Sequence, residues 1–181
     1  MKYLLILFSF TVLNGFVDGK LYPTHNNYTS PNINYTPPFK NYELTNEEVK
    51  MMLGVIADSM SSKDSTGEGW YLRKNRTYTA NIKENNQIRI SNLYYAYERH
   101  ASIDIADKLI DSYFASNKNS LGYQQLSGYG DEGFFHTDDE NFCTFVARKG
   151  KVFIRLKVNK LTSKSNPEAV KRIGKQLLSR V

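Results

Sequence analysis

The residues of this chain best suited to metal binding or acid–base chemistry lie in one stretch between positions 131 and 140. They are the carboxylates of Asp131, Glu132, Asp138, Asp139 and Glu140 and the imidazole of His136. Oxygen ligands and an imidazole bind calcium or zinc, and a carboxylate beside a histidine can also serve acid–base catalysis. The spacing matches neither an EF-hand loop nor a His-Glu-x-x-His zinc motif. We therefore expect a solvent-facing turn with no bound metal, and keep a metal-dependent or hydrolytic enzyme using Asp131, His136 and Asp138 as an alternative.

Two neighbouring segments resemble cofactor or catalytic motifs but lack parts that these motifs need. Residues 128–133 spell G-x-G-x-x-G, yet a dinucleotide site needs a helix after the glycines, and Phe134-Phe-His follows instead. Ser127 has Gln125 where a nucleophile elbow needs its first glycine. We expect a glycine-rich turn here and predict neither a catalytic residue nor a cofactor.

The last part of the chain is strongly basic. Residues 148–181 hold seven lysines and four arginines against one acid, Glu168, in a chain whose net charge is +6. Such a field attracts anions. Four of these cations lie on the polar sides of a predicted strand and a predicted helix: Arg155, Lys157, Lys171 and Lys175. They are the candidate anion-binding residues, and the partner they suggest is an anionic polymer of the cell envelope rather than nucleic acid, since no nucleic-acid motif is present.

The chain has one cysteine, Cys143, so no intramolecular disulfide can form. We expect Cys143 to be a small buried hydrophobe between Phe142 and Phe145. A nucleophile or an intermolecular partner is the alternative.

Three predicted helices must position these residues. The first runs from about 46 to 60 after a capping box formed by Thr45 and Glu48. The second ends near Asn117 and begins at acidic residues around position 104. The third follows Asn166 and Pro167.

About five strands complete the predicted fold. The strand patterns cover residues 70–71, 77–82, 88–97, 121–126, 142–148 and 151–160, with residues 61–69 as a loop. Turns are expected at residues 84–86 and at Gly150. The apolar residues shift from even positions, Ile88 and Ile90, to odd positions from Leu93 on, which predicts a bulge near Ser91 and Asn92. Because strands and helices do not alternate, we predict an α+β fold in which three helices pack on an antiparallel sheet.

The beginning of the chain predicts export. Residues 1–19 combine Lys2, an apolar run and a small final residue, which is typical of a signal peptide. The run is shorter than the roughly 20 residues of a spanning helix. Residues 20–43 are rich in Asn, Pro, Thr and Tyr and read as a flexible tether before a single domain, residues 44–181. The expected location is the periplasm or the extracellular space.

The second half of the chain resembles a family of uncharacterised bacterial exported proteins. The resemblance rests on Gly130-Asp-Glu-Gly-Phe134, Arg148-Lys-Gly150 and Lys157-Val-Asn159, with Gly133 where alanine is usual in the family, and it covers roughly residues 100–181. The segment is more faintly similar to sensor-like and PsbP-like domains. The resemblance implies a fold, a turn at Gly130, an Asp131 side chain bonded to loop amides and a hairpin turn at Gly150, but no activity.

Three hypotheses of function follow. The first is a non-enzymatic binding or interaction module for a protein or ligand of the cell envelope or extracellular space, favoured by the missing catalytic pattern and by the aromatic strand from Leu93 to Tyr97. The second is the enzyme of the acidic stretch. The third is a polyanion-binding protein acting through the basic C-terminal third.

Overall fold

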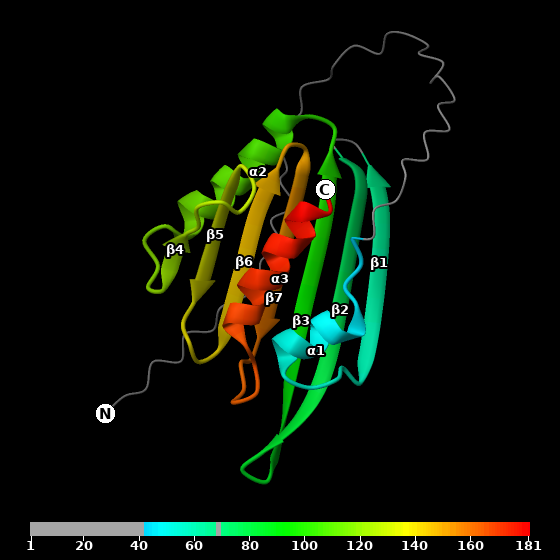
Figure 1. Ribbon diagram of the computed structural model, residues 1–181, viewed down its shortest axis with the longest axis vertical. Coiled ribbons are helices and arrows are strands. Elements are labelled where there is room, and N and C mark those ends of the chain that lie inside the picture. Colours follow the sequence, from blue (N-terminus) through cyan, green and yellow to red (C-terminus); the bar gives the residue numbers. More distant parts are fainter. Residues whose placement is uncertain (1–41, 68–69) are drawn as a thin grey trace, which may run out of the picture. The chain divides into compact units, whose positions relative to one another are not determined.

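The computed structural model describes residues 42–67 and 70–181, which form three helices and one antiparallel sheet of seven strands (Figure 1). In chain order the elements are α1 (Asn46–Leu53), β1 (Ser59–Gly67), β2 (Trp70–Glu84), β3 (Gln87–His100), α2 (Ile103–Asn117), β4 (Tyr123–Gln125), β5 (Glu132–Thr137), β6 (Phe142–Lys149), β7 (Val152–Asn159) and α3 (Pro167–Ser179). The α+β class, the three helices and the antiparallel sheet are confirmed. The predicted signal peptide and residues 20–41 of the predicted tether lie outside the described residues.

The sheet has helices on both faces. Its strand order is β1-β2-β3-β7-β6-β5-β4, and every neighbouring pair is antiparallel. Helices α1 and α3 pack on one face, called here the α3 face, and α2 packs on the other, called the α2 face. Since successive strand residues point to opposite faces, each strand contributes to both layers.

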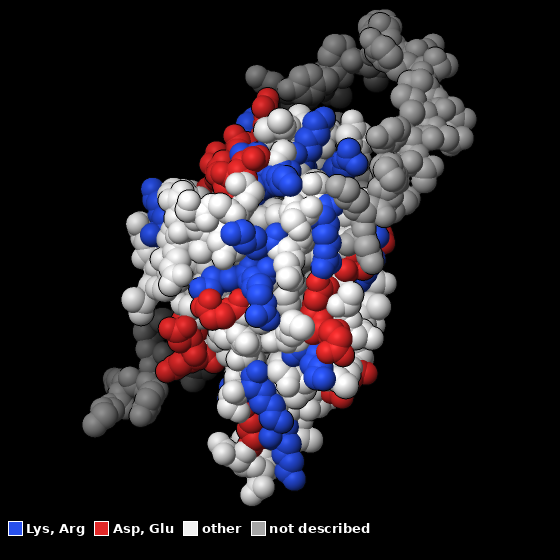
Figure 2. All heavy atoms as spheres, viewed as in Figure 1, with Lys and Arg blue, Asp and Glu red and all other residues white. Residues whose placement is uncertain are grey.

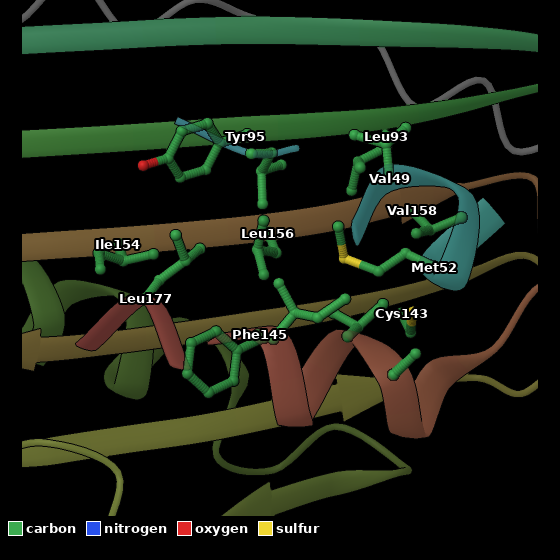
Figure 3. Packing of buried hydrophobic residues seen from close by; sticks show 14 of the residues in the cluster. Val49, Met52, Leu93, Tyr95, Cys143, Phe145, Ile154, Leu156, Val158 and Leu177 are labelled. Carbon is green, nitrogen blue, oxygen red and sulfur yellow. The ribbon is translucent and has the colours of Figure 1, made fainter. Parts of the chain in front are cut away.

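The main core lies between the sheet and the two helices α1 and α3 (Figure 3). Met52 of α1 and Leu177 of α3 pack over inward-facing strand residues such as Phe145 and Leu156, all fully buried. Helix α3 approaches closely because it has Gly174 at the contact: a Cβ there would lie 2.4 Å from the ring of Phe145.

A smaller core lies beneath α2. Ile110 of α2 packs on Phe134, Val146 and Phe153, which point to the α2 face from β5, β6 and β7. Helix α2 covers only part of this face. Beyond it, three apolar side chains of β3 are exposed, namely Ile88, Ile90 and Tyr94. None of the described helices is long and apolar enough to span a membrane.

The prediction of about five strands was wrong because two polar segments are strands. Residues 61–67, expected in a loop, belong to the edge strand β1, whose side chains are almost all exposed, so polar residues suffice there. The predicted helix 46–60 ends at Leu53, since Gly54 has a φ of 78° and a Cβ at that position would lie 1.9 Å from the carbonyl oxygen of Lys164. That contact turns the chain into β1.

The solvent-facing turn expected at 131–140 is also wrong in its first half. Residues 132–137 form β5, an inner strand between β4 and β6. Phe134 and Phe135 are buried on opposite faces of the sheet. Acidic residues flank this short apolar centre, and their density hides the strand pattern.

The predicted bulge near Ser91 is absent. The pairing of β2 with β3 keeps one register from Glu84–Gln87 to Leu72–Arg99. The apolar residues shift from even to odd positions because Ile88 and Ile90 lie exposed on the α2 face, whereas Leu93 is buried on the α3 face. The turn at residues 84–86 is confirmed, with positive φ at Asn85 and Asn86.

The C-terminal predictions are confirmed. Strands β6 and β7 match the predicted strands and are joined at Gly150, which has a φ of 57°. Helix α3 begins after Asn166, whose side chain accepts a hydrogen bond from the amide of Ala169 at 3.0 Å. At the other end, Tyr42 belongs to the domain rather than the tether, since its ring stacks on Tyr97 at 4.3 Å.

Candidate anion-binding pocket

The first acids of the 131–140 stretch surround one buried arginine. The guanidinium of Arg148 lies 2.9 Å from Asp131, 2.9 Å from Glu132 and 3.0 Å from Asp107 of α2. Burial alone would lower the pKa of Arg148, but the three carboxylates outweigh it and raise that pKa. These four residues, the Arg148 cluster, tie α2 to β5 and β6.

Asp131 also holds the neighbouring hairpin. Its carboxylate accepts a hydrogen bond from the amide of Gly150 at 2.7 Å. Asp131 is thus bonded both to the Arg148 guanidinium and to an amide of the β6–β7 turn.

Asp138 organises the turn between β5 and β6. Its carboxylate accepts hydrogen bonds from the amides of Glu140, Asn141 and Phe142 and from the Asn141 side chain, at 2.7 to 3.2 Å. Burial would raise the pKa of Asp138, yet these donors favour the charged form and hold the pKa at about 2. The carboxylate is thus engaged by its own turn.

The residues of the enzyme hypothesis do not come together. Asp131 and Asp138 lie at opposite ends of β5, roughly 20 Å apart at the rise of an extended strand. His136 points to the α2 face between them, and the described residues contain no group of three or more His, Cys, Asp or Glu side chains placed to hold a metal ion.

A pocket with a volume of about 200 Å³ opens on the α2 face at the C-terminal end of α2. We call it the Arg155 pocket. Its lining residues come from α2, β5, β6 and β7: Tyr113, Asn117, Phe134, His136, Phe142, Thr144, Arg155 and Lys157.

Strand pairing explains why these residues meet. His136 pairs with Thr144, Thr144 with Lys157, and Lys157 with Tyr94, so one row of side chains crosses four strands on the same face. Arg155 lies in the next row of β7, opposite Val146. Helix α2 closes the pocket through Tyr113 and Asn117, and the Asn117 side chain donates to the Tyr113 carbonyl at 2.7 Å.

The two cations of the pocket have no acidic partner. Within residues 42–67 and 70–181, neither Arg155 nor Lys157 forms a salt bridge, and Nε of Arg155 is buried with no hydrogen-bond partner. Arg155 donates to the hydroxyl of Tyr113. Burial, and secondarily the charge of Arg155, lowers the pKa of Lys157. The pocket therefore holds positive charge that no described carboxylate neutralises.

Aromatic rings form the walls around this charge. Nζ of Lys157 lies 5.5 Å from the ring centre of Phe142, and the guanidinium carbon of Arg155 lies 5.7 Å from that of Tyr113. The His136 imidazole meets Phe142 edge to face at 4.9 Å. Cations over rings, with a hydroxyl and an imidazole nearby, suit an anionic group carried on an apolar or aromatic body.

The other two predicted anion-binding residues lie on the opposite side of the sheet. Lys171 and Lys175 belong to α3, and Lys171 pairs with Glu168 at 2.6 Å. Their ammonium groups lie 5.0 Å from the ring centres of Phe135 and Tyr129. Figure 2 shows that basic side chains on the α3 face stand beside acidic ones. The four predicted residues thus do not form one surface.

A second hollow, of about 450 Å³, lies near the β2–β3 hairpin and is lined by both signs of charge, including Arg89, Asp139 and Glu140. Arg89 pairs with Glu84 at 3.5 Å. Its charges are mixed, so it favours anions less than the Arg155 pocket does.

Cys143 is fully buried in the main core, as expected. Burial raises the pKa of its thiol to about 12, which keeps it protonated at neutral pH.

Six of the eight lining residues were not predicted for this site, namely Tyr113, Asn117, Phe134, His136, Phe142 and Thr144. His136 was predicted only as part of the acidic stretch. Recognising β5 as a strand would have placed His136, Thr144 and Lys157 in one row.

In comparisons with known proteins, no family model matches the chain, and no curated protein is significantly similar to it.

Proposed function

We propose that this chain is an exported, non-enzymatic binding module that takes a small organic anion into the Arg155 pocket. The observation that carries the proposal is the pair of half-buried cations, Arg155 and Lys157, which has no acidic partner in the described part of the chain. Export is supported by the signal-peptide pattern of residues 1–19.

The energetics favour a ligand with a carboxylate or a phosphate. A partly buried charge without a partner is costly, and an anion that enters the pocket removes that cost while gaining charge-assisted hydrogen bonds. Arg155 can present further N–H donors after bonding Tyr113, and Thr144 adds a hydroxyl. The rings of Phe134 and Phe142 suit an aromatic or apolar body attached to the anion.

The other two hypotheses have less support. An enzyme needs Asp131, His136 and Asp138 in one cleft. Instead, the Asp131 carboxylate pairs with Arg148, and the Asp138 carboxylate accepts hydrogen bonds within the β5–β6 turn. A polyanion binder needs a continuous basic surface, and the sheet separates Arg155 and Lys157 from Lys171 and Lys175.

Calorimetric titration with phenyl phosphate tests the proposal. The wild-type chain is expected to bind it, and Lys157→Met is expected to weaken binding at least tenfold because it removes one of two charge-assisted contacts. Lys171→Met on the α3 face is the matched control and should leave the affinity unchanged. Absent binding, or equal losses in both variants, would contradict the proposal.

A further inference from the structure

The α2 face carries an exposed apolar stripe that begins at the Arg155 pocket. It consists of Tyr94, Ile90 and Ile88 on β3, which are 36 %, 46 % and 72 % exposed. Tyr94 pairs directly with Lys157, so the stripe starts beside the cationic end of the pocket. We call these three residues the β3 stripe.

The β3 stripe runs out along a projecting hairpin. β7 ends at Asn159, which pairs with Asn92, and β1 begins at Ser59, which pairs with Thr79. Ile88 and Ile90 therefore lie beyond the ends of both flanking strands, on the part of the hairpin formed by β2 and β3 alone (Figure 1). Neither isoleucine belongs to the main core or to the smaller core beneath α2.

The opposite face of the same hairpin packs against the main core. Ile82 of β2 points to the α3 face and is almost fully buried in the main core. The hairpin thus has one apolar side chain packed into the core, and two isoleucines directed away from it. Those two contribute nothing to the main core.

Cations lie at both ends of the β3 stripe. Lys83 pairs with Ile88 on β2, and Lys157 pairs with Tyr94 on β7. One acid lies beside the middle of the stripe: the carboxylate of Asp58 accepts from the amide and side chain of Asn81, the partner of Ile90, at 2.6 and 3.1 Å. The charge at the pocket and the apolar surface beside it are therefore complementary to a molecule with an anionic head and an apolar chain.

From these contacts, and resting on the proposed function, we infer that the ligand is a long-chain anionic amphiphile. Its carboxylate or phosphate lies between Arg155 and Lys157, and its chain lies over Tyr94 toward Ile90 and Ile88. The stripe from Tyr94 to Ile88 is about 20 Å long at the rise of an extended strand. An open face covers only one side of a chain, so each added methylene should raise the affinity about twofold, less than the effect of full burial.

The test is a series of alkyl phosphates, ethyl, decyl and hexadecyl, titrated calorimetrically below their aggregation concentrations. Only the hexadecyl chain is long enough to pass Tyr94 and lie over Ile90, so the wild-type chain should bind hexadecyl phosphate at least 30-fold more tightly than ethyl phosphate. In the double variant Ile88→Ser and Ile90→Ser, that preference should fall to less than fivefold, with the affinity for ethyl phosphate unchanged. Ile56→Ser with Leu121→Ser removes two other exposed apolar side chains and should preserve the wild-type preference.

The outcomes separate this inference from the proposed function. Binding of every alkyl phosphate with equal affinity, or a chain-length preference that survives in the Ile88→Ser and Ile90→Ser variant, would overturn the amphiphile and leave the anion pocket standing. Absence of binding to any of them, with or without Lys157→Met, would overturn both.

The occupant is a free amphiphile, because the head-group site is a pocket of about 200 Å³ that takes one anionic group. Tight binding of hexadecyl phosphate without co-sedimentation with phosphatidic acid vesicles would support this. Co-sedimentation with these vesicles, but not with phosphatidylcholine vesicles, that requires Ile88 and Ile90 would assign the face to a membrane and overturn it.

Discussion

Two basic sites on the α2 face contain similar cations but differ in whether carboxylates pair with them. Arg148 is surrounded by Asp107, Asp131 and Glu132, each within 3.0 Å of its guanidinium. Arg155 and Lys157 lie on the next strand of the same face and have no acidic partner in the described residues.

The first of these two sites is structural, and the second is suited to binding. A buried guanidinium with three carboxylates has its hydrogen bonds satisfied and fastens α2 to the sheet. A pair of half-buried cations among aromatic rings is costly until an anion arrives. Charge count alone does not separate these cases, because both sites belong to the same basic third of the chain.

The largest expected effect is on stability and concerns the first site. Arg148→Ala should lower the free energy of unfolding by about 2–3 kcal/mol, because three carboxylates lose their shared partner while keeping partial access to water. Arg155→Ala should change it by less than about 1 kcal/mol. Urea denaturation of the two variants measures both values, and equal losses would contradict a structural role specific to Arg148.

A carboxylate introduced into the second site should make it resemble the first. Thr144 pairs with Lys157, so the side chain of Thr144→Glu reaches its ammonium group. The variant should lose phenyl phosphate binding at least tenfold and keep or slightly gain stability. Thr144→Gln, of the same size but uncharged, is the control. Retained binding in Thr144→Glu would show that the ligand does not use Lys157.

A third prediction concerns alkaline pH. The pKa of Lys157 is lowered by burial, so in the free protein the ammonium loses its proton below the ordinary lysine value of about 10.4. A bound anion favours the charged form, hence affinity should fall as pH rises through this lowered pKa. The unfolded chain holds more protons than the native one over the same range, so this group adds stability as pH rises.

The control for the alkaline experiment is Lys157→Arg, which stays charged and should keep its affinity there. The Arg148 cluster should be insensitive to the same change, because the pKa of Arg148 is raised. A wild-type affinity that is flat from neutral pH to pH 10.5 would contradict the role given to Lys157.

The smallest expected effect is at the turn beside the pocket. Asp138→Ala removes the acceptor of three backbone amides and should cost about 1 kcal/mol, comparable to the loss of a helix cap. Because the pKa of Asp138 is about 2, below its unfolded value, its contribution is present above about pH 4 and is lost as pH falls toward 2. Thermal unfolding of wild type and variant measures their difference in stability across this pH range. A difference that did not shrink in acid would contradict the role given to Asp138.

The sequence predicted the elements with strong local patterns and missed those held by their neighbours. Helix α3 and strands β6 and β7 have clear periodicity and caps, and they were predicted to within a few residues. β1 was missed because an edge strand with exposed side chains needs no apolar residues. β5 was missed because its apolar centre, Phe134 and Phe135, lies among acids.

Two of the eight residues that line the Arg155 pocket were accessible from the sequence. Arg155 and Lys157 alternate with buried residues on a recognisable strand, which places them together on one polar side. His136 and Thr144 lie beside these two cations because of the strand register. Lys171 lies away from them because α3 covers the opposite face of the sheet. Both are properties of tertiary packing, which a single sequence without strand pairing does not encode locally.

The most direct test of the anion pocket is an amide chemical-shift map recorded during titration with phenyl phosphate. If the anion binds in the Arg155 pocket, the largest changes fall on the row His136, Thr144 and Lys157, with little change at Lys171 and Lys175 on α3. Shifts centred on α3, or spread evenly over the basic residues of the chain, would contradict it.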